Sequence, residues 1–338
     1  MKLPDFKYYY SMKVLITGSA GHLGEALMRT LQGSTYEPVG LDIIPSAFTT
    51  HTGSITDRSF VKHCLRGVKT VFHTATLHKP HVGTHSPQQF IDTNITGTLN
   101  LLEEAVAAGA DRFIFTSTTS VFGDALVPPA GTPAAWITEE VRPAPKNIYG
   151  VTKAAAEDLC QLWHRNYGLA CIVLRTSRFF PEEDDNPEMR EQYTDDNLKI
   201  NEYLFRRVDL EDAVSAHLAA AERVRDIGFG KYIISATTPF QPGDMAELRA
   251  HTPQVVQRLF PGYAAEYQRR GWSMLPGIDR VYVNERARLE LGWQPKYDFR
   301  YMIERLKTGS DLRSPLVRLV GSKGYHADTF PEGPYPLK

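Results

Sequence analysis

Tyr149 and Lys153 are the residues whose types and spacing most directly suggest chemistry. Four positions apart on a helix, they would lie on the same face, one turn from each other. An ammonium close to a phenol favours the phenolate, so the spacing predicts a tyrosine pKa lowered toward working pH. Such a phenolate exchanges a proton with an alcohol oxygen while a hydride leaves or reaches the same carbon. Most Tyr-x-x-x-Lys pairs simply lie on a helix surface. Whether this pair is catalytic therefore depends on the motifs upstream of it.

A glycine-rich turn upstream of this pair predicts a phosphate-binding site. Residues 14–16 form a short apolar run, residues 17–24 read Thr-Gly-Ser-Ala-Gly-His-Leu-Gly, and an amphipathic stretch follows over residues 25–31. A strand, a glycine turn and a helix start are the context in which this motif binds a dinucleotide. Its glycines would permit, in order, the tight turn, the approach of the backbone to a pyrophosphate and close helix–strand packing: Gly18, Gly21 and Gly24. A plain strand–helix turn is the alternative.

Asp42 argues against that alternative. It ends a second apolar stretch, residues 39–42, roughly 20 residues after the glycines. A carboxylate there accepts hydrogen bonds from both ribose hydroxyls and repels a 2′-phosphate. No arginine stands beside Asp42, so we predict NAD rather than NADP as the cofactor.

Strand and helix signals then alternate along the chain. We expect helices over residues 59–66 and 87–108, and strands over residues 70–73 and 112–117. The alternation predicts an α/β fold with a doubly wound parallel sheet, a Rossmann fold. Ligands bind such sheets beyond the carboxyl ends of the strands, which is where residues 73–75 and 116–118 fall.

The composition is that of an ordinary globular protein. The chain has 338 residues, a formal net charge of −1, 42% hydrophobic residues and 23% charged residues. The near-zero charge gives no reason to expect nucleic acid or an anionic membrane surface as a partner, and no apolar run approaches the ~18 residues of a membrane span. Residues 1–11 lack the apolar core of a signal peptide, and Met12 is an alternative start. Widely spaced cysteines indicate reduced thiols and a cytoplasmic location: Cys64, Cys160 and Cys171.

Taken in order, the motifs resemble the extended short-chain dehydrogenase/reductase family, whose members include UDP-glucose 4-epimerase and related nucleotide-sugar epimerases and dehydratases. The resemblance covers about residues 12 to 305. The matching segments are the turn from Thr17 to Gly24, Asp42, His73-Thr74-Ala75, Asn94 within Asp92 to Thr98, Ser117 to Gly123, Tyr149-x-x-x-Lys153, Leu174-Arg175, Arg207 to Ala213, and Leu291 to Pro295.

The resemblance implies a role for each matching residue. Tyr149 would be the catalytic acid or base, Lys153 would lower its pKa and hold the nicotinamide ribose, and Thr118 would hydrogen-bond the reacting oxygen. Asn94 would order the active-site water and backbone. Besides these residues, the glycines and Asp42, the predicted cofactor contacts are His22, Leu23, Ser54, Ile55, His73, Thr74, Ala75, Thr116, Ser117 and Thr176.

Departures from the family pattern bear on the substrate. Thr119 and Ser120 stand where the dehydratases carry an acid pair, so elimination of water is not expected. Ser54 replaces the usual adenine-contacting acid, and Arg178 replaces a substrate-facing asparagine. Residues 179–205 also lack the Gly-rich stretch that helps epimerases hold a nucleotide diphosphate. These departures weaken the case for a UDP-sugar and leave the redox centre intact.

A histidine-rich loop follows the strand at residues 70–73. The spacing of His78, His81 and His85 would suit a metal on one face of a helix, but Pro80 and Gly83 interrupt a regular helix, and we predict no metal. Because the loop leaves a strand end beside the nicotinamide, we expect it to line the substrate mouth; a polar surface loop is the alternative. Its cations would suit an anionic or polyhydroxylated substrate. The predicted substrate contacts are His78, Lys79, His81, Thr119, Arg178 and Arg207.

The family pattern also implies a division of the chain. We predict an NAD-binding domain (residues 12–178 and 206–237), a smaller C-terminal substrate-binding lobe (residues 179–205 and 238–305) and a tail (residues 306–338). Within the lobe, the acidic stretch 179–187 is expected to be a solvated surface loop. The aromatic tail is expected to pack on a neighbouring lobe or subunit. Apolar helix faces near residues 94–107 and 149–163 match the family's homodimer interface, and ordinary packing on the sheet explains them equally well.

Three functions are consistent with these residues. The first is an epimerase-like enzyme that transiently oxidises a secondary alcohol of a sugar or nucleotide sugar. The second is an NAD-dependent dehydrogenase or reductase that releases NADH and acts on a sugar, a uronate or another hydroxy compound. The third is a catalytically idle NAD sensor, which would not require Tyr149, Lys153 and Thr118.

Overall fold

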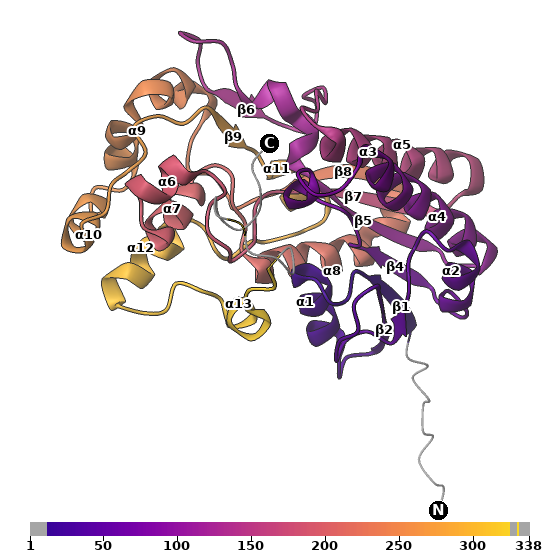
Figure 1. The fold of residues 1–338 in the computed structure, drawn as a ribbon. Coiled ribbons are helices and arrows are strands. Elements are labelled where there is room, and N and C mark those ends of the chain that lie inside the picture. The colour runs from indigo at the N-terminus through magenta and orange to yellow at the C-terminus, as the bar shows by residue number, and fades with distance from the viewer. Residues whose placement is uncertain (1–11, 325–329, 331–338) are drawn as a thin grey trace, which may run out of the picture.

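A seven-stranded parallel sheet forms the centre of the computed structural model, which describes residues 12–324 and residue 330. The strands lie in the order β3-β2-β1-β4-β5-β7-β8 (Figure 1). This is the predicted doubly wound Rossmann sheet. Their bounds are β1 (Met12–Thr17), β2 (Tyr36–Asp42), β3 (His51–Thr52), β4 (Thr70–His73), β5 (Arg112–Thr118), β7 (Ala170–Thr176) and β8 (Phe229–Ile234). The expectations for residues 1–11 and for the tail beyond residue 324, residue 330 apart, lie outside the described residues.

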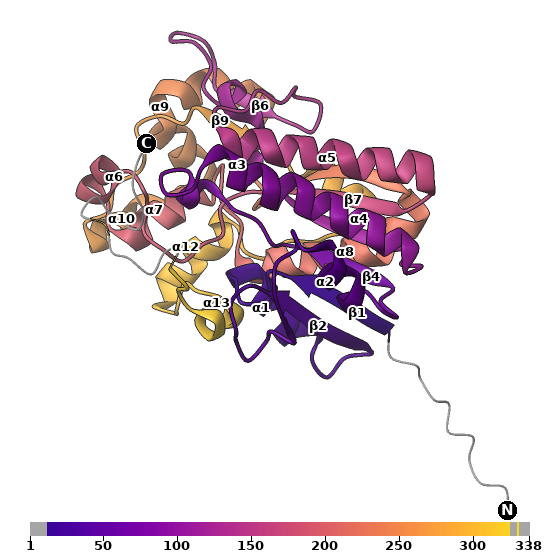
Figure 2. The same ribbon diagram turned by 45° about the vertical axis from the view of Figure 1, so that its right-hand side comes forward.

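Helices cover both faces of the sheet, as the near-continuous apolar strands require. One face carries α1 (His22–Leu31), α8 (Leu210–Ile227), α11 (Glu285–Glu290) and α13 (Pro315–Val320), and the other carries α2 (Arg58–Cys64), α4 (Gly97–Ala107) and α5 (Ile148–Tyr167). Figure 2 shows α4 and α5 side by side on their face. Both layers meet strands such as β1, whose Val14, Leu15 and Ile16 are fully buried.

A second, smaller hydrophobic cluster lies beyond the carboxyl ends of the strands. Its helices are α6 (Pro187–Gln192), α7 (Asp195–Glu202), α9 (Met245–Leu259), α10 (Tyr263–Arg270) and α12 (Phe299–Thr308), and the 3₁₀ turn η4 (Pro242–Asp244) precedes α9. A two-stranded parallel sheet, β6 (Ala135–Ile137) with β9 (Arg280–Tyr282), lies beside it. The first residue of this cluster is Ala134, so a short segment from the middle of the nucleotide-binding half joins the C-terminal part of the chain.

The helix predicted over residues 87–108 is three pieces. The structure has α3 (Pro87–Phe90), a π-helical stretch η2 (Ile91–Thr96) and then α4. A π-helix shifts the hydrogen-bond ladder by one residue and recurs at functional sites. Here it carries Asn94, which is 2% exposed. Two 3₁₀ segments, η1 (Lys79–His81) and η3 (Thr119–Leu126), follow β4 and β5.

The described part of the tail packs on the sheet layer. Val320 of α13 is buried in the same cluster as α1 and α8, and Leu316 and Val317 pack against it. Among the described residues, no helix combines the length and hydropathy needed to cross a bilayer. Cys64, Cys160 and Cys171 are buried free thiols.

Candidate active site

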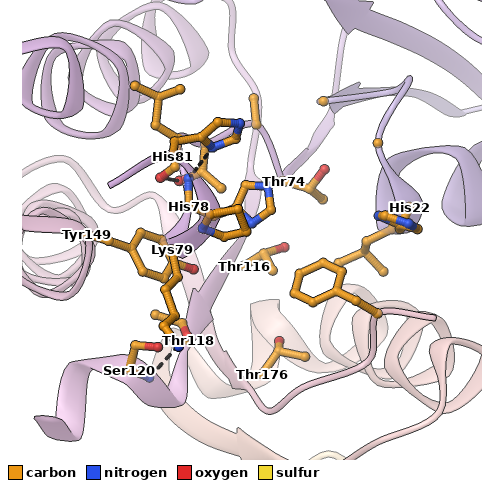
Figure 3. A pocket seen from close by; sticks show the side chains of 18 of the residues that line it. His22, Thr74, His78, Lys79, His81, Thr116, Thr118, Ser120, Tyr149 and Thr176 are labelled. Atoms are coloured by element: carbon orange, nitrogen blue, oxygen red, sulfur yellow. Dashed lines mark hydrogen bonds between the residues drawn. The ribbon is translucent and has the colours of Figure 1, made fainter. Parts of the chain in front are cut away.

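A cleft of about 1130 Å³ runs along the carboxyl ends of the parallel strands. Its walls come from the glycine turn, the ends of β2, β4, β5 and β7, the start of α5 and the loop after β7. Figure 3 shows His22, Thr74, Thr116, Thr118, Tyr149 and Thr176 around this common space. Most of the predicted site residues line it: Gly18, Gly21, His22, Leu23, Gly24, Asp42, Ser54, Ile55, Thr74, Ala75, His78, Lys79, His81, Thr116, Ser117, Thr118, Thr119, Tyr149, Thr176 and Arg178.

The glycine turn has the tight geometry that the motif predicts. Gly18 has φ of 72°, a conformation that favours glycine, and its N–H donates to Leu41 O at 2.7 Å. A Cβ on Gly24 would stand 1.9 Å from Gly18 O, so only glycine allows α1 to start this close to the turn. Gly21 is the N-cap of α1 and provides no side-chain cap. The first N–H groups of the helix therefore have no acceptor within the helix.

Asp42 is held next to the glycine turn by backbone donors. Its carboxylate accepts from Ala20 N–H at 2.9 Å and from Ile44 N–H at 2.9 Å, one on each oxygen. It is 9% exposed and lines the cleft. Each oxygen retains a lone pair toward the cleft, as recognition of two ribose hydroxyls requires.

His73 lies beneath the cleft and does not line it. Its Nδ1 contacts Thr17 Oγ1 at 2.8 Å and its Nε2 contacts Thr98 Oγ1 at 2.9 Å. Burial lowers the pKa of His73 well below its usual value. Thr17 Oγ1 in turn accepts from the N–H groups of Thr74 and Ala75. His73 therefore positions the backbone that lines the cleft.

Tyr149 and Thr118 meet at the centre of the cleft. Tyr149 lies in the first turn of α5 and is 8% exposed, and Thr118 ends β5 and is also 8% exposed. Burial raises the pKa of Tyr149 to about 12, against the effect of a side-chain hydrogen bond with Thr118. The spacing argument predicted a lowered tyrosine pKa, and in the protein alone the shift has the opposite sign because desolvation outweighs the neighbouring groups.

Lys153 lies behind the cleft wall instead of on it. Its Nζ donates to Thr116 O at 2.6 Å and stands 4.0 Å from the centre of the Phe115 ring. Burial lowers the pKa of Lys153 to about 7. Thr116 is itself fixed by a hydrogen bond of 2.8 Å to His217 Nε2. Lys153 is thus held by the residue that precedes Ser117 on β5, and Ser117 lines the cleft.

Asn94 is a second residue that acts from behind the cleft. Its Oδ1 accepts from Thr76 Oγ1 and from Leu77 N–H, both at 2.9 Å. Its Nδ2 donates to Leu77 O at 2.8 Å and to Thr152 Oγ1 at 3.0 Å. The amide therefore ties the base of the histidine-rich loop to α5, between Tyr149 and Lys153.

The histidine-rich loop lines the cleft, and its rings pack against one another. His78 and His81 meet edge to face at 4.6 Å between ring centres, and His81 and His85 at 5.0 Å. Lys79 forms an ion pair with Asp185. Within the described residues, no group of three or more potential ligands is arranged to hold a metal ion.

The acidic stretch after β7 is not the solvated loop that its composition predicted. Asp184 is 5% exposed and pairs with Arg178, and Asp185 pairs with Lys79 across the cleft. Glu182 contacts His22 at 2.8 Å. Two of these partners, Lys79 and His22, come from segments distant in sequence, so local composition does not reveal the contacts.

Arg207 lies outside the cleft, and its neighbour lines it instead. Arg207 pairs with Glu202 at 2.8 Å and donates to Phe180 O. Arg206 reaches the cleft and pairs with Glu202 and Asp184. The buried Glu202, whose pKa is lowered to about 2 because the surrounding arginines outweigh its burial, is the centre of this network.

Several cleft residues escaped the sequence argument. Arg280 and Tyr282 share one face of β9, with buried Val281 on the other. Strand alternation indicates that shared face, but only the tertiary pairing of β9 with β6 brings it to the cleft. Further examples are Lys146, Asn147, Ser177, Phe180, Lys323 and Gly324.

Several known proteins are similar to this chain in sequence and in fold. A model of the NAD-dependent epimerase/dehydratase family matches residues 14–234. The chain is 33% identical over 342 residues to an uncharacterised protein of Sinorhizobium fredii, covering 91% of this chain and 81% of that one. It is 27% identical over 328 residues to a UDP-glucose 4-epimerase of Rhizobium meliloti, covering 86% and 94%. A solved short-chain dehydrogenase/reductase superfamily protein from Agrobacterium tumefaciens, with bound NAD, has a TM-score of 0.63 at 22% identity, covering 88% of this chain and 96% of that chain.

Proposed function

We propose that this chain, which belongs to the NAD-dependent epimerase/dehydratase family, transiently oxidises a secondary alcohol of a sugar or nucleotide sugar, as an epimerase does. One observation carries the proposal: Tyr149 and Thr118 meet in the same cleft as the glycine turn and Asp42. A phenol and a hydroxyl at one end and a dinucleotide cradle at the other are the parts that redox chemistry at a carbinol needs.

The cleft fits NAD on features of its own residues. Gly18 and Gly24 allow the tight turn before α1, because a Cβ at either position would clash with neighbouring atoms of the chain, and Asp42 lines the cleft next to this turn. Ser177, at the end of β7, has a buried Oγ without a hydrogen-bond partner among the described residues. A buried hydroxyl that lines a cleft without a partner marks a place for a ligand group, and we assign it to the nicotinamide end.

The proposed chemistry divides between the cofactor and the chain. When bound, NAD supplies the hydride acceptor and a positive charge on its nicotinamide ring. Tyr149 takes the hydroxyl proton of the substrate as the carbinol carbon is oxidised, and returns it when the carbonyl is reduced. Thr118 donates a hydrogen bond to the same oxygen. Lys153, fixed by the Thr116 carbonyl, adds a charge that favours the phenolate against the effect of burial.

The substrate end of the cleft favours an anionic ligand. Arg280 lines it, makes no ion pair within the described residues, and has a buried Nε without a hydrogen-bond partner. A guanidinium stays protonated in proteins and binds carboxylate or phosphate in a fork. Tyr282 N–H donates to Phe205 O at 3.0 Å, which brings the backbone before Arg206 alongside the same strand. We infer that Arg280 meets a carboxylate or phosphate of the substrate.

The second candidate is a dehydrogenase that releases NADH and acts on a sugar, a uronate or another hydroxy compound. One observation favours it: Arg178, at the family's substrate-facing position, is tied to Asp184 at 2.5 Å and to Glu202 at 3.5 Å. A guanidinium committed to two carboxylates is poorly placed to hold a nucleotide diphosphate as well.

A substrate panel separates the two candidates. Purified protein, after release and identification of its bound nucleotide, would be incubated with NAD and with free sugars, uronates or UDP-sugars. Interconversion of epimers with retained NAD and no net NADH supports epimerisation. One NADH per substrate oxidised supports the dehydrogenase. Inactivity on every NAD-dependent reaction of a folded, NAD-loaded protein would support the idle sensor and contradict both candidates.

We also propose a homodimer in the cytoplasm. The outer faces of α4 and α5 carry half-buried apolar side chains, including Leu99, Val106, Leu159 and Leu162, and Val151 is 48% exposed. Packing of α4 and α5 against the same helices of a second copy would cover these side chains. Light scattering on the eluting protein should give twice the chain mass of 38.0 kDa, and a monomer would contradict the proposal.

A further inference from the structure

A short segment after α13 crosses the cofactor end of the cleft. Lys323 and Gly324 line the cleft, although they lie about 300 positions from the glycine turn in sequence. Their starting point is fixed because α13 packs on α1 and α8 through Val320. Figures 1 and 2 show α13 beside α1 in both views.

Glu182 anchors this segment from the opposite side. Its Oε1 accepts from the Ser322 hydroxyl at 2.7 Å, from the Lys323 N–H at 3.0 Å and from the Gly324 N–H at 3.2 Å. The same oxygen lies 2.8 Å from His22 Nε2. One carboxylate oxygen therefore joins the loop after β7, the segment after α13 and the first residue of α1.

The glycine-turn side contributes a second set of contacts. Lys323 pairs through its amine with Glu25, one turn into α1. The His22 ring meets the Phe180 ring edge to face at 5.5 Å between centres. Contacts on both sides of the segment close it over the start of α1, where the phosphates of a dinucleotide bind.

The charge of Glu182 persists throughout the ordinary pH range. Burial alone would raise the pKa of Glu182, but hydrogen bonds and charge from His22, with a further bond from Ser322, hold it at about 2. Hydrogen bonds to a carboxylate are about twice as strong as those between neutral groups. The anchor is thus an ionised carboxylate that accepts charge-assisted hydrogen bonds.

We propose that residues 321–324 form a strap that closes the cofactor end of the cleft, with Glu182 as its anchor, and that slows the exchange of NAD. The proposal rests on the cleft binding NAD at its glycine turn, as inferred above, and extends it to how the cofactor is retained. Within residues 12–324, the contacts of the strap with Glu182, His22 and Glu25 join protein to protein. The strap must therefore open both when NAD enters the cleft and when it leaves. It affects the association and dissociation rates of NAD more than the affinity.

The test measures NADH binding and release by fluorescence, without any substrate. Glu182→Ala removes the anchor, and Ser322→Ala removes one donor while leaving the carboxylate. Glu183→Ala is the matched control, because Glu183 is the exposed acid next in sequence. We expect Glu182→Ala to raise the dissociation and association rates together, each by about tenfold or more, since it removes several charge-assisted bonds. Ser322→Ala should raise both by less, and Glu183→Ala should match the wild type.

The outcomes separate the strap from the proposed function. Wild-type rates in Glu182→Ala, in protein that still binds NADH, would overturn the strap and leave the redox function untouched. A faster dissociation with an unchanged association would also overturn it, because Glu182 would then contact the cofactor directly. A wild-type protein that binds no NADH or NAD would contradict the proposed function, and the strap with it. Circular dichroism and thermal unfolding of each variant identify any change caused by misfolding.

Discussion

At the scale of single residues, burial sets the pKa values of the proposed catalytic pair. The Tyr149–Lys153 spacing predicts a shared helix face, and α5 provides it. The spacing does not reveal that both side chains are almost fully buried, so that burial raises the pKa of Tyr149 to about 12 and lowers the pKa of Lys153 to about 7. In the proposed enzyme, the positive nicotinamide ring would help to form the phenolate. Catalytic competence therefore depends on the cofactor as well as on the pair.

The buried Lys153 should leave a signature in the pH dependence of stability. Its folded pKa of about 7 lies below the 10.5 of an ordinary lysine, so the unfolded chain binds one proton more between these values. Raising the pH through that window therefore stabilises the folded protein. Relative to Lys153→Met, nucleotide-free wild type should gain about 1.4 kcal/mol of unfolding free energy per pH unit. Urea denaturation at several pH values checks this, and parallel curves for the two proteins would contradict it.

Arg280 is the residue on which selectivity for an anionic substrate should depend. We expect Arg280→Met to raise KM for an anionic substrate by about tenfold or more, since a charge-assisted fork is lost. The KM of a neutral analogue and the affinity for NAD should stay near wild type. Arg300→Met is the matched control, because Arg300 is exposed and outside the cleft. An equal change in KM for charged and neutral substrates would show that Arg280 does not recognise the charge of the substrate.

At the scale of elements, buried residues that do not line the cleft hold its walls in place by hydrogen bonds. Asn94 in η2 joins Leu77 to Thr152, and His73 of β4 fixes the backbone after the same strand through Thr17. The family pattern predicted both as cofactor contacts, and neither lines the cleft. Their roles follow from burial and hydrogen bonding, which a motif does not encode.

Asn94→Asp tests whether this support matters for the loop that it holds. The aspartate keeps an acceptor for Leu77 N–H but loses the donors to Leu77 O and Thr152 Oγ1. We expect faster amide hydrogen exchange over residues 77–85 and a fall in kcat/KM of about tenfold. Asn100→Asp, which loses donors to Ile55 O and Thr56 O, should loosen residues 55–56 instead. Unchanged exchange over residues 77–85 in Asn94→Asp would contradict the assignment.

Local patterns predicted the elements well and their tertiary partners poorly. The strand predicted over residues 70–73 is β4, and the glycine turn has the expected backbone at Gly18. The pieces that close the cleft were missed, because their positions depend on long-range contacts: β9 pairs with β6, and Glu182 meets His22 and Ser322. An acidic, proline-bracketed stretch looks solvated until its partners are placed.

At the scale of the whole molecule, two hydrophobic clusters meet at one cleft. The sheet layers supply the glycine turn, Asp42, Thr118 and Tyr149, and the cluster of α6, α7, α9, α10 and α12 lies beside the substrate end. This is the arrangement in which doubly wound folds bind ligands. The domain division stays a prediction: α11, which it assigns to the substrate-binding lobe, packs on the sheet, and β6, which it assigns to the NAD-binding domain, pairs with β9.

The central claim, that Tyr149 exchanges the proton of a reacting carbinol, is tested most directly by comparing Tyr149→Phe with wild type on the substrate that the panel identifies. The variant removes one oxygen from the cleft and leaves the glycine turn and Asp42 in place. We predict that it retains bound NAD and loses turnover by on the order of 10²–10⁴-fold, the usual contribution of general acid–base catalysis. Wild-type turnover in NAD-loaded Tyr149→Phe would contradict the account.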